Sequence, residues 1–176
     1  RQVCLEMGVP RYVVVSSGTV TRPDSAVYQL LNTVGSGIMQ AKLQGEDAVR
    51  TMYREQSATT TTHGPSIRLG YTIIRPGGLT NDDDGLAPAL LELNQGDTKS
   101  GRLSRSSVAE LCLECLKAPD AWDTTWECYE SNTAKPIASI GLSNILKLTR
   151  PTTQQSGRER RGDSWDTLFE GLERDA

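Results

Sequence analysis

The run Arg11-Tyr-Val-Val-Val-Ser-Ser17 is the stretch of this sequence that indicates its fold most directly. It carries no charge after its first residue and is rich in β-branched side chains, which is typical of a strand covered on both faces of a parallel sheet. A second run, Gly70-Tyr-Thr-Ile-Ile-Arg-Pro-Gly-Gly78, is likewise apolar and β-branched before its single charge, Arg75. It should leave the sheet at Pro76, where a proline and two glycines interrupt the hydrogen-bonded ladder. The two runs predict parallel strands.

The segment between these strands predicts a crossover helix. Apolar or small residues recur there at steps of three and four, which places them on one helix face. These residues are Ile38, Ala41, Gly45, Ala48 and Met52. We expect this face to lie against the sheet, because its small members allow a close approach. Strand, helix and strand then form one crossover unit.

Two further elements are expected downstream. Ser107-Val-Ala-Glu110 matches a capping box at the start of a helix. Its apolar face would comprise Val108, Leu111, Cys112, Cys115 and Leu116. Residues 123–130 alternate between polar and apolar side chains, which favours a strand at or near a sheet edge.

The rest of the chain is expected to be mostly irregular. Residues 132–176 contain prolines and a polar stretch, with one short helix expected around residues 142–148 and a short amphipathic helix at the end. Trp165, Leu168, Phe169 and Leu172 would share one face of that last helix. Residues 57–66, rich in threonine and turn formers, are interpreted as an inserted loop.

Composition limits the classes of function. The 176 residues are 36% hydrophobic, enough for one globular domain. The net charge of −3 argues against nucleic-acid binding, and no apolar run reaches the roughly 18 residues of a membrane-spanning helix. Four cysteines and one histidine, irregularly spaced, favour a reducing compartment over a disulfide scaffold or zinc site. Because Arg1 begins inside a helix-like segment, we expect further residues upstream.

Four motifs follow one another in an order that resembles a known family. They are Ser16-Ser17 after a strand, Lys42-Leu-Gln-Gly-Glu-Asp-Ala48, Tyr71-Thr-Ile-Ile-Arg-Pro-Gly-Gly-Leu79 and Gly101-Arg-Leu-Ser-Arg-Ser-Ser-Val-Ala109. The order resembles the C-terminal half of the atypical short-chain dehydrogenase/reductases, the NAD(P)-binding group often called NmrA-like, and particularly its plant and algal plastid members. The resemblance implies an α/β fold, a Rossmann-like doubly wound parallel sheet, of which residues 1–131 would form the C-terminal part.

The resemblance also implies a cofactor and its binding residues. Ser16, Ser17 and Lys42 would face NADP or NAD, with Lys42 holding the nicotinamide ribose. Pro76, Gly77 and Gly78 would frame the nicotinamide ring. No glycine-rich phosphate-binding turn follows a strand here, because the half of the fold that carries it is absent from the sequence. The choice between NAD and NADP stays open, since the residue that reads the ribose 2′ position belongs to that half.

The position of the family's catalytic tyrosine holds another residue. Active members place a tyrosine four residues before the lysine as general acid/base, whereas here Ile38 precedes Lys42. The resemblance therefore implies an NAD(P)-dependent oxidoreductase or epimerase-like protein that lacks the usual tyrosine. The alternative is a non-catalytic structural or regulatory subunit of a larger organellar complex, such as a photosynthetic one. In either case a plastid location is implied. We also expect a protein partner that completes the sheet or docks on Trp165 and Phe169, the alternative for these two aromatic residues being that they fold back on the chain's own core.

Other reactive residues favour structural roles. Cys112 and Cys115 lie on an apolar helix face beyond its first turn and are interpreted as buried thiols. His63 lies in the threonine-rich loop without a neighbouring acid or nucleophile, and Asn81-Asp-Asp-Asp-Gly85 lacks the later ligands of a calcium loop. We therefore expect no metal site. The resemblance suggests that Arg105 fixes a loop on the substrate side.

Overall fold

The computed structural model describes residues 2–59, 68–81, 85–139 and 158–176 and is built around one four-stranded sheet. Its strands are β1 (Arg11–Val15), β2 (Gly70–Pro76), β7 (Thr124–Glu130) and β4 (Leu91–Asn94), in the spatial order β1-β2-β7-β4. The first three run parallel and β4 is antiparallel to β7. This parallel-dominated α/β sheet confirms the predicted fold class.

The two strands predicted first are neighbours in the expected register. Val13 pairs with Thr72 and Val15 pairs with Ile74. All residues of β2 are buried, whereas β1 is only half-buried and Val15 is 46% exposed. The prediction of two covered faces is correct for β2 and holds in part for β1, where Val13 packs against one apolar cluster and Tyr12 and Val14 pack against the other. β1 is more exposed than β2 because, within the described residues, it has a strand neighbour on one side only.

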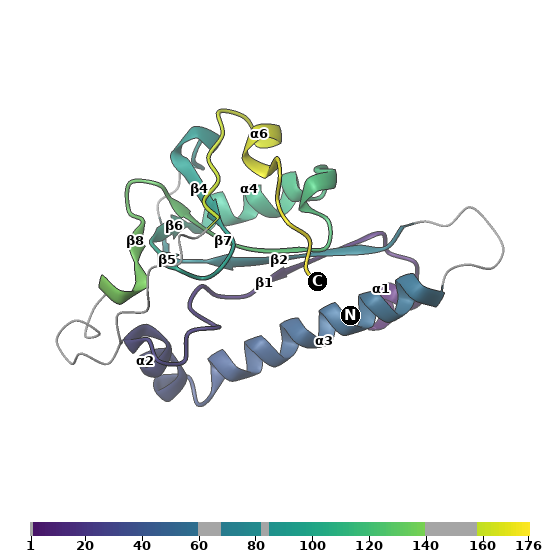
Figure 1. Ribbon diagram of the computed structural model, residues 1–176, viewed down its shortest axis with the longest axis horizontal. Coiled ribbons are helices and arrows are strands. Elements are labelled where there is room, and N and C mark those ends of the chain that lie inside the picture. The colour runs from purple at the N-terminus through teal and green to yellow at the C-terminus, as the bar shows by residue number, and fades with distance from the viewer. Residues whose placement is uncertain (1, 60–67, 82–84, 140–157) are drawn as a thin grey trace.

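Helices cover both faces of the sheet (Figure 1). On one side lies the long helix α3 (Ile38–Thr59), with α2 (Ala26–Val34) near its start and α1 (Gln2–Glu6) near its end. On the other side lie α4 (Arg105–Cys115) and α6 (Trp165–Phe169). Short strands complete the fold: β3 (Gly78–Thr80) pairs with β6 (Arg102–Ser104), and β5 (Lys99–Ser100) pairs with β8 (Lys135–Pro136).

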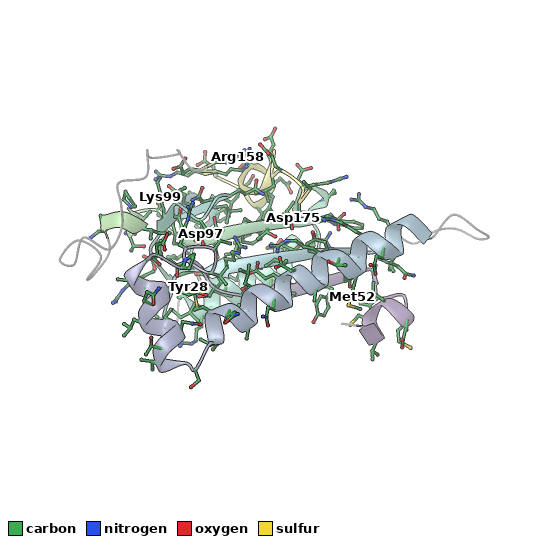
Figure 2. All side chains as sticks on the ribbon, turned by 60° about the horizontal axis from the view of Figure 1, so that its bottom comes forward. Tyr28, Met52, Asp97, Lys99, Arg158 and Asp175 are labelled. Carbon is green, nitrogen blue, oxygen red and sulfur yellow. The ribbon has the colours of Figure 1, made fainter. Side chains whose placement is uncertain are left out.

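Helix α3 turns a different face to the sheet from the one predicted. Its buried residues are Met39, Glu46, Val49 and Tyr53, while Ile38 is 45% exposed. Met52 instead lies on the side of α3 near α1 (Figure 2). The apolar pattern misidentified the face because the buried one includes the carboxylate of Glu46, which pairs with an arginine inside the fold.

Strand β7 lies second from one edge of the described sheet, which agrees with the expectation of a strand near a sheet edge. It lies between β2 and β4, and six of its seven residues are buried. Its outer neighbour β4, Leu91-Glu-Leu-Asn94, escaped prediction because it carries buried polar side chains. Glu92 is fully buried and pairs with Lys99 and Arg161. Because Glu92 is charged, the sequence alone does not indicate that this strand is buried.

The segment after residue 157 belongs to the main core. Leu168, Phe169 and Leu172 pack with residues of the sheet and α4, and the rings of Phe169 and Trp126 lie 5.9 Å apart. Phe169 is 1% exposed, so the expectation that it folds back on the chain's own core is confirmed, and the alternative that it anchors a partner is wrong. Trp165 is half-buried against the same core.

Several predicted boundaries change or fall outside the described residues. Ser104, rather than Ser107, caps α4 by accepting a hydrogen bond from the Ser107 amide. Residues 57–59 complete α3 instead of opening a loop. The rest of the proposed inserted loop and the helix expected at 142–148 lie outside the described residues. Across the described ranges, no helix combines the length and apolar character needed to cross a membrane.

The burial of Phe169 yields a stability prediction. Phe169→Ala should lower the free energy of unfolding by about 3–5 kcal/mol, because it removes a buried ring and leaves a cavity against Trp126. Urea denaturation measures the change. Leu113→Ala, at a 60% exposed site on α4, serves as control and should change it by less than about 0.5 kcal/mol. Equal effects of the two substitutions would contradict the docking of α6 on the core.

Candidate functional site

The carboxyl ends of β1 and β2 bring two of the sequence motifs together. The amide of Ser16 donates to the carbonyl of Ile74 at 2.7 Å, and the amide of Gly18 donates to the carbonyl of Pro76 at 2.9 Å. Ser16 and Ser17 therefore lie beside the turn that begins at Pro76. Open α/β sheets bind their ligands at this edge, beyond the carboxyl ends of the strands.

Lys42 reaches the same edge from the beginning of α3. Its Nζ donates to the carbonyl oxygen of Ser16 at 3.0 Å, and the side chain is half-buried. An ammonium group has three protons to donate, and this is its one hydrogen bond within the described part of the chain. Two protons of Lys42 are thus available to a ligand at the end of β1.

The two glycines after β2 differ in what surrounds them. A Cβ on Gly77 would lie 2.3 Å from the carbonyl oxygen of Gly101, so only glycine fits this contact. Gly78 is exposed, and a Cβ there would approach no atom closer than 3.7 Å. Packing inside the fold therefore explains Gly77. At Gly78 the backbone is open to a ligand.

Thr80 is a site residue that the sequence reasoning missed. Its Oγ1 is buried and has no hydrogen-bond partner among the described residues. Arg105 donates to the carbonyl of Thr80 and to Asn81 Oδ1, which fixes the loop after β3. A buried hydroxyl without a partner is costly unless a ligand or water satisfies it. The sequence feature that could have identified Thr80 is its hydroxyl, two positions beyond the glycine pair.

Asp97 holds the loop that carries the serines. Its Oδ1 accepts from the Thr19 amide at 2.7 Å, and its Oδ2 accepts from the amide and the hydroxyl of Thr21 at 3.0 and 2.7 Å. Arg22 in turn donates to the carbonyl of Asp97. Asp97 is 1% exposed and its backbone has φ +52°, which a turn between β4 and β5 requires. These bonds fix the conformation of the chain directly after Ser16 and Ser17.

A buried ion network connects this loop to α3. Arg75 donates from Nη2 and Nε to Glu46 at 2.7 and 3.1 Å, and from Nη1 to Glu127 at 3.0 Å. Glu127 also accepts from the Asp97 amide at 2.9 Å. All four residues are at least nine-tenths buried. The network therefore links α3, β2, β7 and the turn after β4 through charge-assisted bonds.

The pKa values of the two glutamates in this network are shifted in opposite directions. Burial, with the added negative charge of Asp97, raises the pKa of Glu127 to about 7 against the attraction of Arg75. Burial also acts to raise the pKa of Glu46, but the hydrogen bonds and charge of Arg75 outweigh it and lower that pKa below its ordinary value. Glu127 is therefore the member that takes up a proton near neutral pH.

The remaining candidate residues have structural or undescribed positions. Ile38 is the first residue of α3, one turn before Lys42. Burial raises the pKa of Cys115 to about 12, which agrees with a structural thiol. His63 and residues 82–84 lie outside the described residues. In the ranges that are described, no three His, Cys, Asp or Glu side chains gather as a metal site would require.

Comparison with known proteins places this geometry in context. A family model described as NAD(P)H-binding matches residues 2–119. An uncharacterized chloroplastic protein of Arabidopsis thaliana is 33% identical over 122 residues, which cover 64% of this chain and 36% of that protein. The chain thus spans about a third of that relative's length.

Solved structures share the fold at low identity. The oxidoreductase ylbE from Lactococcus lactis superposes with a TM-score of 0.52 at 20% identity, over 83% of this chain and 56% of that one. A short-chain dehydrogenase/reductase (wide type) from Veillonella parvula in complex with NADP gives 0.52 at 20% identity, over 75% of this chain and 56% of that one. The chain therefore corresponds to about half of each structure.

The raised pKa of Glu127 predicts a specific pH dependence. The unfolded chain releases this proton near the ordinary value of 4.5 and the folded protein near 7, so its stabilising contribution is complete below 4.5 and is lost as pH rises through 7. Between about pH 5 and pH 8, the free energy of unfolding of the wild type should fall relative to Glu127→Gln by on the order of 1–3 kcal/mol.

Urea denaturation at several pH values measures this difference. Glu170→Gln, at an exposed site after α6, is the matched control and should track the wild type. A constant difference between wild type and Glu127→Gln across this range would contradict the assignment of a raised pKa.

Proposed function

This chain belongs to the NAD(P)H-binding family, and on that premise we propose that it forms the nicotinamide side of a dinucleotide-binding site in the whole protein. The observation that carries the proposal is the contact of Lys42 Nζ with the carbonyl of Ser16, at the sheet edge where Ser17 and Pro76 also lie. The chain spans 56% of the similar structures. The phosphate-binding turn is thus proposed to come from residues outside this sequence.

The described residues fit such a cofactor. The two unused protons of Lys42 suit the hydroxyls of a ribose, and the exposed backbone at Gly78 suits a flat ring. The unpaired hydroxyl of Thr80 suits a carboxamide. A bound dinucleotide would supply hydride transfer, while Ser16, Ser17 and Lys42 would orient it at the strand ends. Asp97 would keep their loop in place.

The proposed chemistry is that of an oxidoreductase or epimerase-like protein of the atypical short-chain dehydrogenase/reductase type, using NADP or NAD in a plastid. Ile38 stands one turn before Lys42, where the family's tyrosine is expected, and an isoleucine transfers no proton. Lys42 then acts in binding the cofactor rather than in lowering the pKa of a phenol. Any proton transfer must come from another group.

Ile38 also favours a second candidate, a cofactor-binding subunit without turnover in an organellar complex. Within the described residues, β1 has a strand neighbour on one side only, so its other edge is suited to a further strand from the whole protein or from a partner. If this candidate is correct, the whole protein should co-purify with a complex in fixed stoichiometry, and turnover should be absent. A monomer that oxidises NADPH with a Lys42-dependent rate would contradict it.

Cofactor binding is tested by titrating the whole protein with NADPH and following energy transfer from tryptophan to the nicotinamide. Lys42→Ala should weaken binding roughly 10- to 100-fold, because it removes hydrogen bonds from a charged donor. Lys117→Ala, which removes an exposed lysine beyond α4, is the control and should bind like the wild type. Absence of a saturable signal at several hundred micromolar, or equal affinities of the two variants, would contradict the proposed site.

A further inference from the structure

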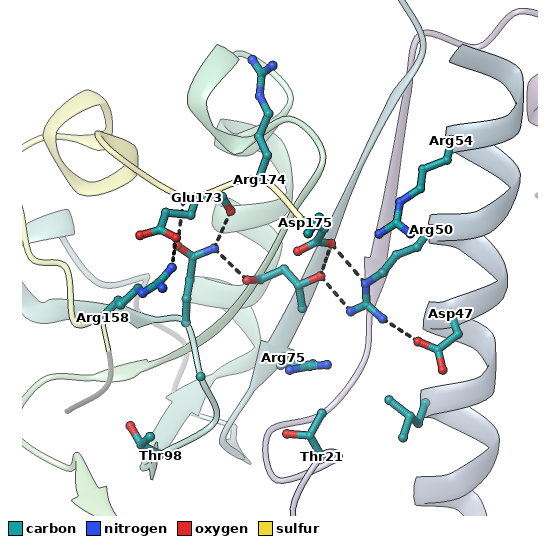
Figure 3. Close-up of a pocket in the computed structure, with 15 residues that line it drawn as sticks. Thr21, Asp47, Arg50, Arg54, Arg75, Thr98, Arg158, Glu173, Arg174 and Asp175 are labelled. Atoms are coloured by element: carbon teal, nitrogen blue, oxygen red, sulfur yellow. Dashed lines mark hydrogen bonds and ion pairs between the residues drawn. The ribbon is translucent and has the colours of Figure 1, made fainter. Parts of the chain in front are cut away.

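A polar cavity lies on the α3 side of the sheet. It has a volume of about 760 Å³ and is bordered by α3, the turn after β4 and residues 173–176 (Figure 3). Arg50 and Arg54 enter it from α3. Arg50 is eight residues beyond Lys42, roughly 12 Å along the helix. Arg50 therefore lies well apart from Lys42, while the cavity reaches Leu43 and Thr21 at its other end.

Three donors, two of which line this cavity, converge on one carboxylate oxygen. Asp175 Oδ2 accepts from Arg50 Nε at 3.2 Å, from the Tyr71 hydroxyl at 2.9 Å and from Thr125 Oγ1 at 2.6 Å. The donors come from α3, β2 and β7, so the fold itself brings them together. Only 16% of the Arg50 side chain and 15% of the Asp175 side chain are exposed. This is a built binding site for an anionic oxygen, filled here by the chain's own carboxylate.

Tyr71 is suited to remain a donor in this site. Burial, together with the neighbouring carboxylate of Asp175, raises the pKa of the phenol well above its ordinary value. The hydroxyl therefore keeps its proton at physiological pH.

Polar contacts alone hold the segment that supplies the carboxylate. The backbone of Glu173 exchanges hydrogen bonds with the side chain of Gln95 at 2.8 and 2.9 Å, and the Asp175 amide donates to the carbonyl of Asp123 at 2.8 Å. Leu172 is the last buried apolar residue, and the residues on either side of Asp175 are exposed. The net contribution of each such polar contact to stability is modest, so residues 173–176 can be released locally without unfolding of the core.

Arg54 adds an unused cation to the cavity. It lies one turn after Arg50, and Figure 3 shows its side chain extending from α3 toward Asp175. No hydrogen bond or ion pair engages it within the described residues. An anion that replaced Asp175 would therefore gain a guanidinium group with five free donors.

We propose that Arg50, Arg54, Tyr71 and Thr125 form a binding site for a phosphate monoester, and that Asp175 is its internal competitor. A tethered carboxylate competes at an effective concentration in the millimolar range or above, so a free monocarboxylate of the same chemistry has no advantage over it. A phosphate monoester carries a charge of about −1.5 to −2 and three acceptor oxygens. It can engage the three donors of the Asp175 site and Arg54 at once.

The test measures binding of glycerol 2-phosphate to the whole protein by NMR titration, at constant ionic strength set with sodium chloride. Asp175→Ala removes the internal competitor and should bind the ester at least 10-fold more tightly than the wild type. Asp163→Ala makes the same change in charge at an exposed site outside the cavity and should match the wild type. Adding Arg54→Gln to Asp175→Ala should remove most of the gain, whereas adding Lys135→Gln, at an exposed site on β8, should keep it.

A measurement on the unaltered protein decides the question even if a variant does not fold. Saturating glycerol 2-phosphate should accelerate hydrogen exchange at the amides of Glu173 and Asp175, because the ligand releases their segment. Equal affinity of Asp175→Ala and the wild type, or unchanged exchange at saturation, would overturn the proposal. Succinate binding as tightly as the ester would overturn the assignment to phosphate.

Discussion

The structure depends on one buried guanidinium, that of Arg75 in the centre of the sheet. It lies between Glu46 on α3 and Glu127 on β7, with hydrogen bonds of 2.7–3.1 Å to both. A buried charge that lost its partner would be strongly destabilising, by about 3–5 kcal/mol in comparable cases. The rotation of α3 over β2 and the distance between β2 and β7 are therefore constrained by the need to keep both pairs complete.

The same network connects the two positions of α3 that carry chemistry, Lys42 near its beginning and Arg50 in its middle. Through Glu127 it reaches Asp97, which holds the loop after Ser16 and Ser17. Through Glu46 it reaches Arg50, which contacts Asp175. A single helix thus presents Lys42 to the carboxyl ends of the strands and Arg50 to the polar cavity. The proposed cofactor site and the proposed phosphate site are fixed by one set of buried ion pairs.

Sequence reasoning identified part of the candidate site and missed the rest for a physical reason. Ser16, Lys42 and Pro76 were found because each stands at a fixed place in a local motif, and the fold does bring them to one sheet edge. Thr80 and Asp97 were missed because their importance comes from burial and from distant partners. Asp97 reads as an ordinary turn residue after Gly96, yet it accepts hydrogen bonds from a loop more than 70 residues away.

The amino-acid sequence by itself determined the strands at residues 11–15 and 70–76, their parallel order, the crossover helix and the existence of α4, although not its first residue. Apolar runs, glycines and prolines act on neighbouring residues, so these features are visible locally. Only the tertiary structure decided which face of α3 is buried, that β7 lies inside the sheet beside β4, and that Phe169 belongs to the core. It also placed Asp175 on Arg50, 125 positions earlier in the chain. Such pairings depend on long-range geometry, because the partners of a charged or aromatic residue are distant in sequence and come into contact only in the folded chain.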